Sequence, residues 1–179
     1  MTQLHKVLLV GQMGAGKSTV ARLLAARWAE FDAVDLDALI EARAGCTVAE
    51  IFRTRGEPAF RTLEAEVLGA ALDSPRPLVI ATGGGAPCPP GALARMRAAG
   101  MVIWLAAPPP VLAARALGDA RPLLADLDLA GAARFLATQL EARRPFYEAA
   151  DLTVDASLPP DEVASAIDRA LGVLVHPAR

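Results

Sequence analysis

The sequence contains no asparagine and only two lysines among its 179 residues. A protein that reads guanine through an NKxD segment needs an asparagine there, so a guanine-specific switch of that type is excluded. Lysine and arginine together number 18, which leaves sixteen arginines beside Lys6 and Lys17. In a chain with so strong a preference for arginine, the lysine at position 17 indicates a chemical requirement for lysine at that place.

Cysteine, long apolar runs and excess charge are also scarce. Cys46 and Cys88 form neither a CxxC motif nor a metal-binding spacing, so we expect reduced thiols and a cytoplasmic protein. No apolar run approaches the roughly 18 residues that cross a bilayer, and we read the first apolar run as a strand and not as a signal peptide. The formal net charge of −2 gives no electrostatic reason to expect nucleic acid or a membrane surface as a partner.

The chain alternates between strand-like and helix-like segments. Its length and its 54% content of hydrophobic residues suit one domain, which we expect to be a monomer. Apolar segments predict strands at 6–10, 33–37, 77–82, 101–107 and 152–156. Helical spacing predicts helices from 17 to 28 and at 47–52, 58–72, 91–99, 109–117, 130–149 and 160–174. Because most strands are apolar on both faces, we predict a three-layer α/β/α sandwich around a five-stranded parallel sheet.

The segment GQMGAGKSTV at 11–20 follows the first strand and begins the first helix. It satisfies the pattern GxxxxGK[ST], in which backbone amides and a helix amino terminus surround phosphate groups. Lys17 is placed to reach the β- and γ-phosphates, and the Ser18 hydroxyl to bind Mg²⁺. The motif predicts a nucleotide as phosphate donor but leaves the acceptor open.

Several features bear on that acceptor. The strand at 77–82 ends in ATGGGAP in place of the aspartate that a motor or hydrolase typically places there, which argues against either of these. Asp35 and Asp37 are two residues apart in a predicted strand, so we expect their carboxylates on one face. There, one carboxylate could help to hold Mg²⁺, and the other could orient or deprotonate a hydroxyl. Glycines at 83–85 follow a strand end, where open α/β sheets bind ligands. Alternatively, Asp35 and Asp37 are solvated acids at an exposed strand end, and the glycines at 83–85 form a flexible turn.

The ordered segments GQMGAGKST, DLD, AEIFRTRGEPAFRTLE, TGGGA, RPLL and RRPFY together resemble the shikimate kinase family, of the P-loop kinase type. The resemblance extends from about residue 7 to residue 155. It implies transfer of the γ-phosphate of ATP to the 3-hydroxyl of shikimate, a step toward chorismate and the aromatic amino acids. It also implies Mg²⁺ as the cofactor and a mobile lid near 115–128.

The resemblance also assigns roles to individual residues. Catalytic roles fall to Lys17, to Asp37 as the candidate base, and to Arg121 on the lid, while Ser18 and Asp35 hold the metal. ATP is bound by Gly14, Ala15, Gly16, Lys17, Ser18, Thr19, Arg115 and Arg121. Shikimate is bound by Asp37, Arg61, Gly83, Gly84, Gly85 and Arg143, the two arginines on its carboxylate.

Two departures and two alternatives accompany this interpretation. Leu36 stands where the family often has threonine, and the loop DASLPP at 155–160 lacks the basic or asparagine residues that many members place there. A sibling kinase for another hydroxylated acid such as gluconate could use the same acids and arginines. A non-catalytic ATP-binding protein on the same fold is the alternative from a different class, although such a protein would be free to lose one of these residues.

Overall fold

The computed structural model describes residues 4–117, 124 and 126–175. Its five strands form one parallel sheet in the order β2-β3-β1-β4-β5. The strands are β1 Lys6–Val10, β2 Asp32–Asp35, β3 Leu78–Ala81, β4 Met101–Ala106 and β5 Leu152–Asp155. The predicted five-stranded parallel sheet is therefore confirmed.

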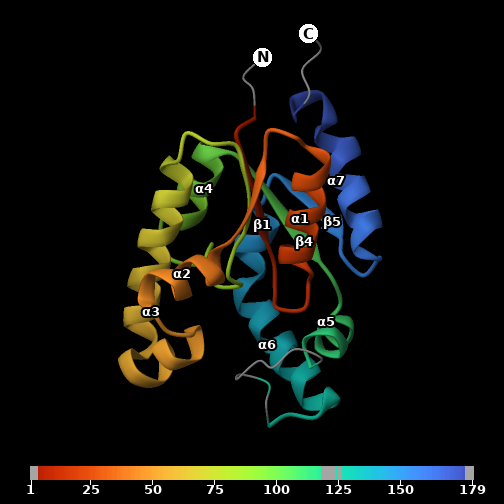
Figure 1. Ribbon diagram of the computed structural model, residues 1–179. Helices are drawn as coiled ribbons and strands as arrows, with labels where there is room; N and C mark the ends of the chain where they lie inside the picture. The colour runs from red at the N-terminus through yellow and green to blue at the C-terminus, as the bar shows by residue number, and fades with distance from the viewer. Residues whose placement is uncertain (1–3, 118–123, 125, 176–179) are drawn as a thin grey trace.

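Helices cover both faces of this sheet (Figure 1). They are α1 Lys17–Arg27, α2 Leu36–Ala44, α3 Val48–Asp73, α4 Ala92–Ala99, α5 Pro109–Ala116, α6 Leu129–Glu148 and α7 Pro160–Val175. Along β1, Val7 and Leu9 pack in one apolar cluster with α1, α5 and α7, whereas Leu8 and Val10 pack in another with α2, α3 and α4. Side chains of β1 thus alternate between two cores, as the three-layer prediction requires.

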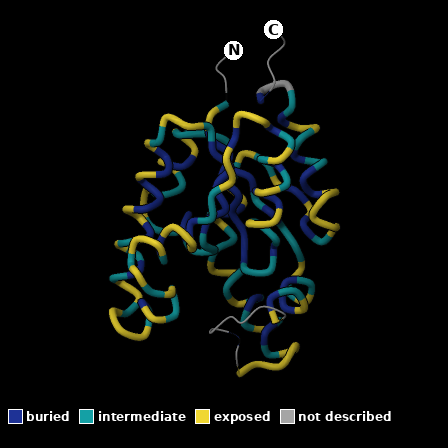
Figure 2. Tube along the Cα trace, in the orientation of Figure 1, coloured by how far each residue is buried: buried dark blue, intermediate teal, exposed yellow. Residues whose placement is uncertain are grey.

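The central strands β1 and β3 are buried along their whole length, whereas the edge strands β2 and β5 are partly exposed (Figure 2). Even Lys6, at the start of β1, is only 3% exposed. Its ammonium donates to the carbonyl oxygens of Ser74 at 2.8 Å and Arg76 at 2.7 Å, which joins β1 to the chain just beyond α3. Among the described residues, no helix is both long enough and apolar enough to cross a membrane.

The predicted strand at 33–37 is wrong at its end, because the chain turns into α2 after Asp35. The Asp35 carboxylate accepts hydrogen bonds from the backbone amides of Asp37 and Ala38, at 3.0 and 3.2 Å, and so caps the new helix. Asp37 therefore lies in the first turn of α2, and the two aspartates are not neighbours on one face of a strand. The helix was missed because its first two residues, Leu36 and Asp37, were assigned to the end of the strand.

The two helices predicted at 47–52 and 58–72 form the single element α3, which is broken at one residue. Gly56 has φ 78° and ψ 172°, outside the helical region. Thr47 and Glu50 form a capping box at its start: Thr47 accepts from the Glu50 amide at 3.2 Å, and Glu50 accepts from the Thr47 amide at 2.9 Å. The hydrogen bonds that the Glu50 carboxylate accepts from the Thr47 amide and hydroxyl lower the pKa of that carboxyl group.

Candidate active site

A cleft of about 710 Å³ opens at the carboxyl ends of the strands. The loop after β1, the end of β2 and the glycines after β3 all lie along it, together with residues of α3, α5 and α6. β1 has β3 on one side and β4 on the other, and this change of direction is where open α/β sheets bind ligands. Every predicted site residue that the structure describes lines the cleft: Gly14, Ala15, Gly16, Lys17, Ser18, Thr19, Asp35, Asp37, Arg61, Gly83, Gly84, Gly85, Arg115 and Arg143.

The phosphate loop connects β1 to α1. Gly16 is the N-cap of α1 and has a left-handed conformation, with φ 83°. Gly14 has φ 80°, and a Cβ atom built on it would lie only 2.4 Å from the carbonyl oxygen of Leu112 in α5. Glycine at position 14 therefore allows both the curl of the loop and its close contact with α5.

Lys17 folds back over this loop. Its ammonium donates to the carbonyl oxygens of Gly11 at 2.8 Å and Gln12 at 2.9 Å. The Gln12 side chain is itself buried, 2% exposed, and its amide donates to the backbone oxygen of Leu136 in α6 at 3.0 Å. Sequence reasoning did not identify Gln12, because its partner is 124 residues away.

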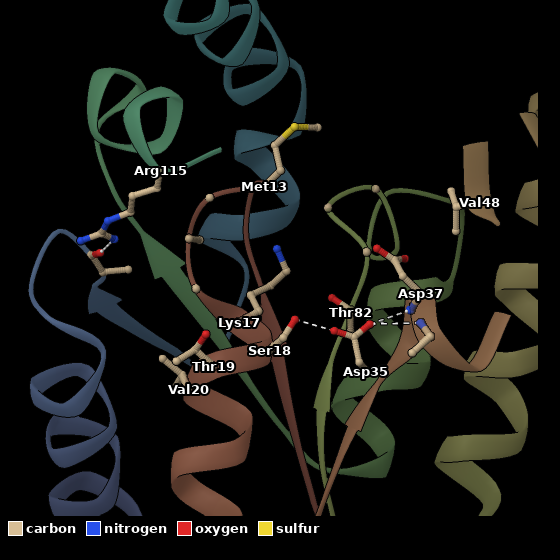
Figure 3. Close-up of a pocket in the computed structure, with 18 of the residues that line it drawn as sticks. Met13, Lys17, Ser18, Thr19, Val20, Asp35, Asp37, Val48, Thr82 and Arg115 are labelled. Carbon is tan, nitrogen blue, oxygen red and sulfur yellow. Dashed lines mark hydrogen bonds between the residues drawn. The ribbon is translucent and has the colours of Figure 1, made fainter. Parts of the chain in front are cut away.

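Ser18 and the two aspartates lie together on the other side of the loop (Figure 3). The Ser18 hydroxyl donates to the Asp35 carboxylate at 2.5 Å, and Asp35 uses its other oxygen to cap α2. Hydroxyl and carboxylate oxygens suit Mg²⁺, which keeps several waters and binds few protein ligands. The described residues contain no group of three or more His, Cys, Asp or Glu side chains able to hold a metal. The donor set therefore fits a magnesium ion held mainly by water and phosphate.

The glycines after β3 leave space that charged side chains fill. A Cβ atom added at each one would lie close to a different side chain: 2.6 Å from Glu64 Oε1 at Gly83, 2.9 Å from Arg143 Nη1 at Gly84, and 2.8 Å from Arg61 Nη1 at Gly85. The same atom at Gly83 would lie 3.4 Å from Asp37 Oδ1. The absence of side chains at 83–85 thus allows two cations and two carboxylates to converge on one end of the cleft.

Arg61 is held by two carboxylates of its own helix. Its Nη1 donates to Glu64 at 2.6 Å, while Nε and Nη2 reach Glu57 at 3.3 and 3.1 Å. Glu57 is exposed, but the Glu64 side chain is only 3% exposed. Burial raises the pKa of Glu64, and the neighbouring Arg61 opposes that rise. Sequence reasoning gave Glu64 no role, although its position three residues after Arg61 on a helix is a signal for such a pair.

Arg115 lies at the opposite end of the cleft from Asp37, with Lys17 and Ser18 between them (Figure 3). Its guanidinium donates to the carbonyl oxygens of Ala156 at 2.5 Å, Ser157 at 2.8 Å and Leu158 at 3.2 Å. Arg115 therefore holds the loop after β5 against α5. Its predicted part in ATP binding stays a prediction.

Comparison with known proteins agrees with this geometry. A sequence model described as shikimate kinase matches residues 13–171. The chain belongs to the shikimate kinase family.

Individual members of the family are similar over most of the chain. A shikimate kinase of Paramagnetospirillum magneticum is 44% identical over 161 residues, 89% of this chain and 78% of that protein. One of Symbiobacterium thermophilum is 49% identical over 144 residues, 79% of this chain and 80% of that protein. The crystal structure of a shikimate kinase from Bacteroides thetaiotaomicron has a TM-score of 0.88 at 32% identity, covering 94% of this chain and 99% of that one.

A shikimate kinase from Acinetobacter baumannii, solved in complex with shikimate, has a TM-score of 0.86 at 33% identity, covering 98% of this chain and 96% of that one. These similarities confirm the predicted family, its P-loop kinase fold and its class of enzyme. As a kinase of this family the chain uses ATP as co-substrate. Arg121 and half of the predicted lid at 115–128, residues 118–123 and 125, lie outside the described residues.

We predict that Gly14→Ala weakens ATP binding roughly tenfold or more, because the added methyl group meets the Leu112 carbonyl and the left-handed conformation strains any other residue. Isothermal titration with a non-hydrolysable ATP analogue measures the effect. Gly172→Ala in α7 is the matched control, since nothing lies within 4 Å of a Cβ atom there. Unchanged affinity in the Gly14 variant would mean that the loop does not depend on its contact with α5.

Proposed function

We propose that this protein transfers the γ-phosphoryl group of ATP to the 3-hydroxyl of shikimate, giving shikimate 3-phosphate and ADP. One observation supports this most directly. A phosphate loop and a pair of arginines that could hold a carboxylate line the same cleft, with Asp37 also in its wall. A small anionic polyol with a reactive hydroxyl is the acceptor that such a cleft suits.

On the donor side, the amides of Gly14 to Thr19 surround the β- and γ-phosphates, and the Lys17 ammonium moves from its loop carbonyls to the phosphate oxygens. Ser18 and Asp35 would hold Mg²⁺, Asp35 through a water molecule. When bound, this ion neutralises charge on the phosphates. Arg115 and the loop that it holds flank the adenine.

On the acceptor side, Arg61 and Arg143 bind the shikimate carboxylate. Arginine suits this task because its planar fork matches the two oxygens of a carboxylate. Glu64 supports the arrangement by fixing Nη1 of Arg61, which leaves the other donors of that guanidinium for the substrate once Glu57 moves aside. Because Gly83, Gly84 and Gly85 have no side chains, the hydroxylated ring of shikimate can approach their backbone.

Asp37 is the proposed base. In the first turn of α2 it is close to Gly83, and hence to the end of the cleft where the arginines place the acceptor. A carboxylate there can orient the 3-hydroxyl and take its proton as the new P–O bond forms. Most of the rate enhancement in phosphoryl transfer comes from positioning and charge neutralisation. The contact of Arg121 with the transferred group, and the lid near 115–128, stay predictions.

The remaining assignments follow from this chemistry. ATP and shikimate are small metabolites, and their use suits a cytoplasmic, monomeric, single-domain enzyme that needs neither nucleic acid nor a membrane. A coupled assay of ADP release with Mg²⁺ tests the proposal by comparing shikimate, gluconate and no acceptor. Release that depends on shikimate supports it. Release with gluconate alone favours a sibling kinase, and ATP binding without release favours the binding protein.

Asp37→Asn is expected to lower kcat by roughly 10²–10⁴ while ATP affinity stays the same, because the amide cannot accept the proton. Steady-state kinetics and calorimetry measure the two quantities. Asp73→Asn, at an exposed ion pair with Arg95, removes the same charge far from the cleft and serves as control. A kcat close to that of the wild type would remove Asp37 from the role of base.

Arg143→Lys is expected to raise the KM for shikimate roughly tenfold or more, because a lysine cannot make the two parallel hydrogen bonds of a guanidinium. The next residue supplies the control. Arg144 is partly exposed and pairs with Glu141 and Glu148 at 3.9 and 3.6 Å, so Arg144→Lys should leave this KM unchanged. Equal effects of the two substitutions would argue against a carboxylate clamp at Arg143.

A further inference from the structure

Tyr147 is the only tyrosine of the chain, and its role is not explained by the reaction scheme. It lies on α6 one helical turn after Arg143, on the same side of the helix. Its side chain is completely buried, yet it ends in a hydroxyl group that burial would penalise without a partner. What that hydroxyl contacts therefore indicates why a tyrosine occupies the position.

The hydroxyl donates a short hydrogen bond, 2.6 Å, to the backbone carbonyl of Gly84. Gly84 is the middle glycine after β3 and is 63 residues away in the sequence. A Cβ atom placed on Gly84 would lie 2.9 Å from Arg143 Nη1 and 3.7 Å from the Tyr147 oxygen. The hydroxyl, the arginine and the glycine thus meet at one point, just behind the wall of the acceptor end of the cleft.

The ring that bears the hydroxyl is held in place by packing. It stacks on Trp104 of β4, with ring centroids 5.7 Å apart and an angle of 24° between the planes. Burial raises the pKa of Tyr147 to about 12, and the nearby Arg143 guanidinium works in the opposite direction. The hydroxyl consequently stays protonated, and remains a donor to Gly84, across the whole pH range in which an enzyme is assayed.

We propose that Tyr147 is a positioning residue for the acceptor: its hydroxyl fixes the Gly84 carbonyl and, through it, the spacing between the glycine loop and the Arg143 guanidinium. The inference rests on the proposed function, because it concerns the groups that hold the shikimate carboxylate and ring. Tyr147 touches neither substrate and moves no proton. A plain core hydrogen bond, important for stability only, is the competing explanation.

Tyr147→Phe separates the two explanations, since it keeps the ring on Trp104 and removes only the hydroxyl. We expect the KM for shikimate to rise roughly 5- to 50-fold, the KM for ATP to stay within about twofold, and kcat to fall less than kcat/KM. The pH profile should keep its wild-type shape. Trp104→Phe is the control: it weakens the packing but leaves the hydroxyl, and should lower Tm with little change in either KM.

A double-mutant cycle with Arg143→Lys gives the sharper test. If the hydroxyl acts through Arg143, the two substitutions together should raise the KM for shikimate clearly less than the product of their separate effects. Independent effects, equal shifts in both KM values, or a new limb in the pH profile would overturn the proposal.

Hydrogen exchange over residues 82–88 keeps the inference testable apart from the activity. The Ala86 and Cys88 amides donate to Gly83 and Gly85 at 3.1 and 3.0 Å, so they report on the order of this loop. Their exchange should accelerate in Tyr147→Phe and not in Trp104→Phe. If the wild type releases no ADP with shikimate, the proposed function fails, whereas unchanged exchange in Tyr147→Phe would overturn the positioning role itself.

Discussion

The parallel pairing of β2, β3 and β1 is the constraint on which the site depends. Leu9, Ala81 and Asp35 lie beside one another across the three strands. The loops that follow β1, β3 and β2 therefore leave the sheet at the same edge. The Thr82 hydroxyl and amide both donate hydrogen bonds to the Leu9 carbonyl oxygen, at 3.0 and 3.1 Å. The pairing of β3 with β1 thus continues one residue beyond Ala81. Phosphate loop, aspartates and glycines therefore meet at one edge, although they are far apart in the sequence. A parallel sheet with long crossover connections makes this possible, because all its carboxyl ends lie on one side.

At the glycines after β3, two carboxylates and two guanidinium groups lie close together. Glu64 is buried, and its charge would be costly without the guanidinium of Arg61 beside it. The three glycines at 83–85 leave the space that this pair and Arg143 occupy. Exposed Glu57 pairs with the other donors of Arg61, and an exposed pair of this kind contributes only about 0–1 kcal/mol. Arg61 is thus oriented firmly by buried Glu64 and only weakly by exposed Glu57.

The sequence predicts the features that depend on short-range patterns. Strand and helix periodicity locates the sheet and most helices, and the Gly16, Lys17 and Ser18 signature locates the phosphate loop before any contact is known. It does not predict α2, because the turn after Asp35 is made by a cap that uses the same carboxylate that bonds Ser18. Nor does it reveal contacts such as Gln12 with Leu136 or Tyr147 with Gly84, which join residues more than sixty positions apart and follow no spacing rule.

Those last two contacts have one helix in common. α6 accepts the Gln12 amide at Leu136 and donates through Tyr147 to Gly84, so it is tied to the phosphate loop near its middle and to the glycine loop near its end. Eleven residues of helix separate the two ties, about 16 Å at a rise of 1.5 Å per residue. Arg143 lies between them. Because α6 is held at both points, these two contacts limit how far the phosphate loop can move relative to the arginine proposed to hold the acceptor. In-line transfer needs such a limit, since a displacement of about 1 Å can cost a hundredfold in rate.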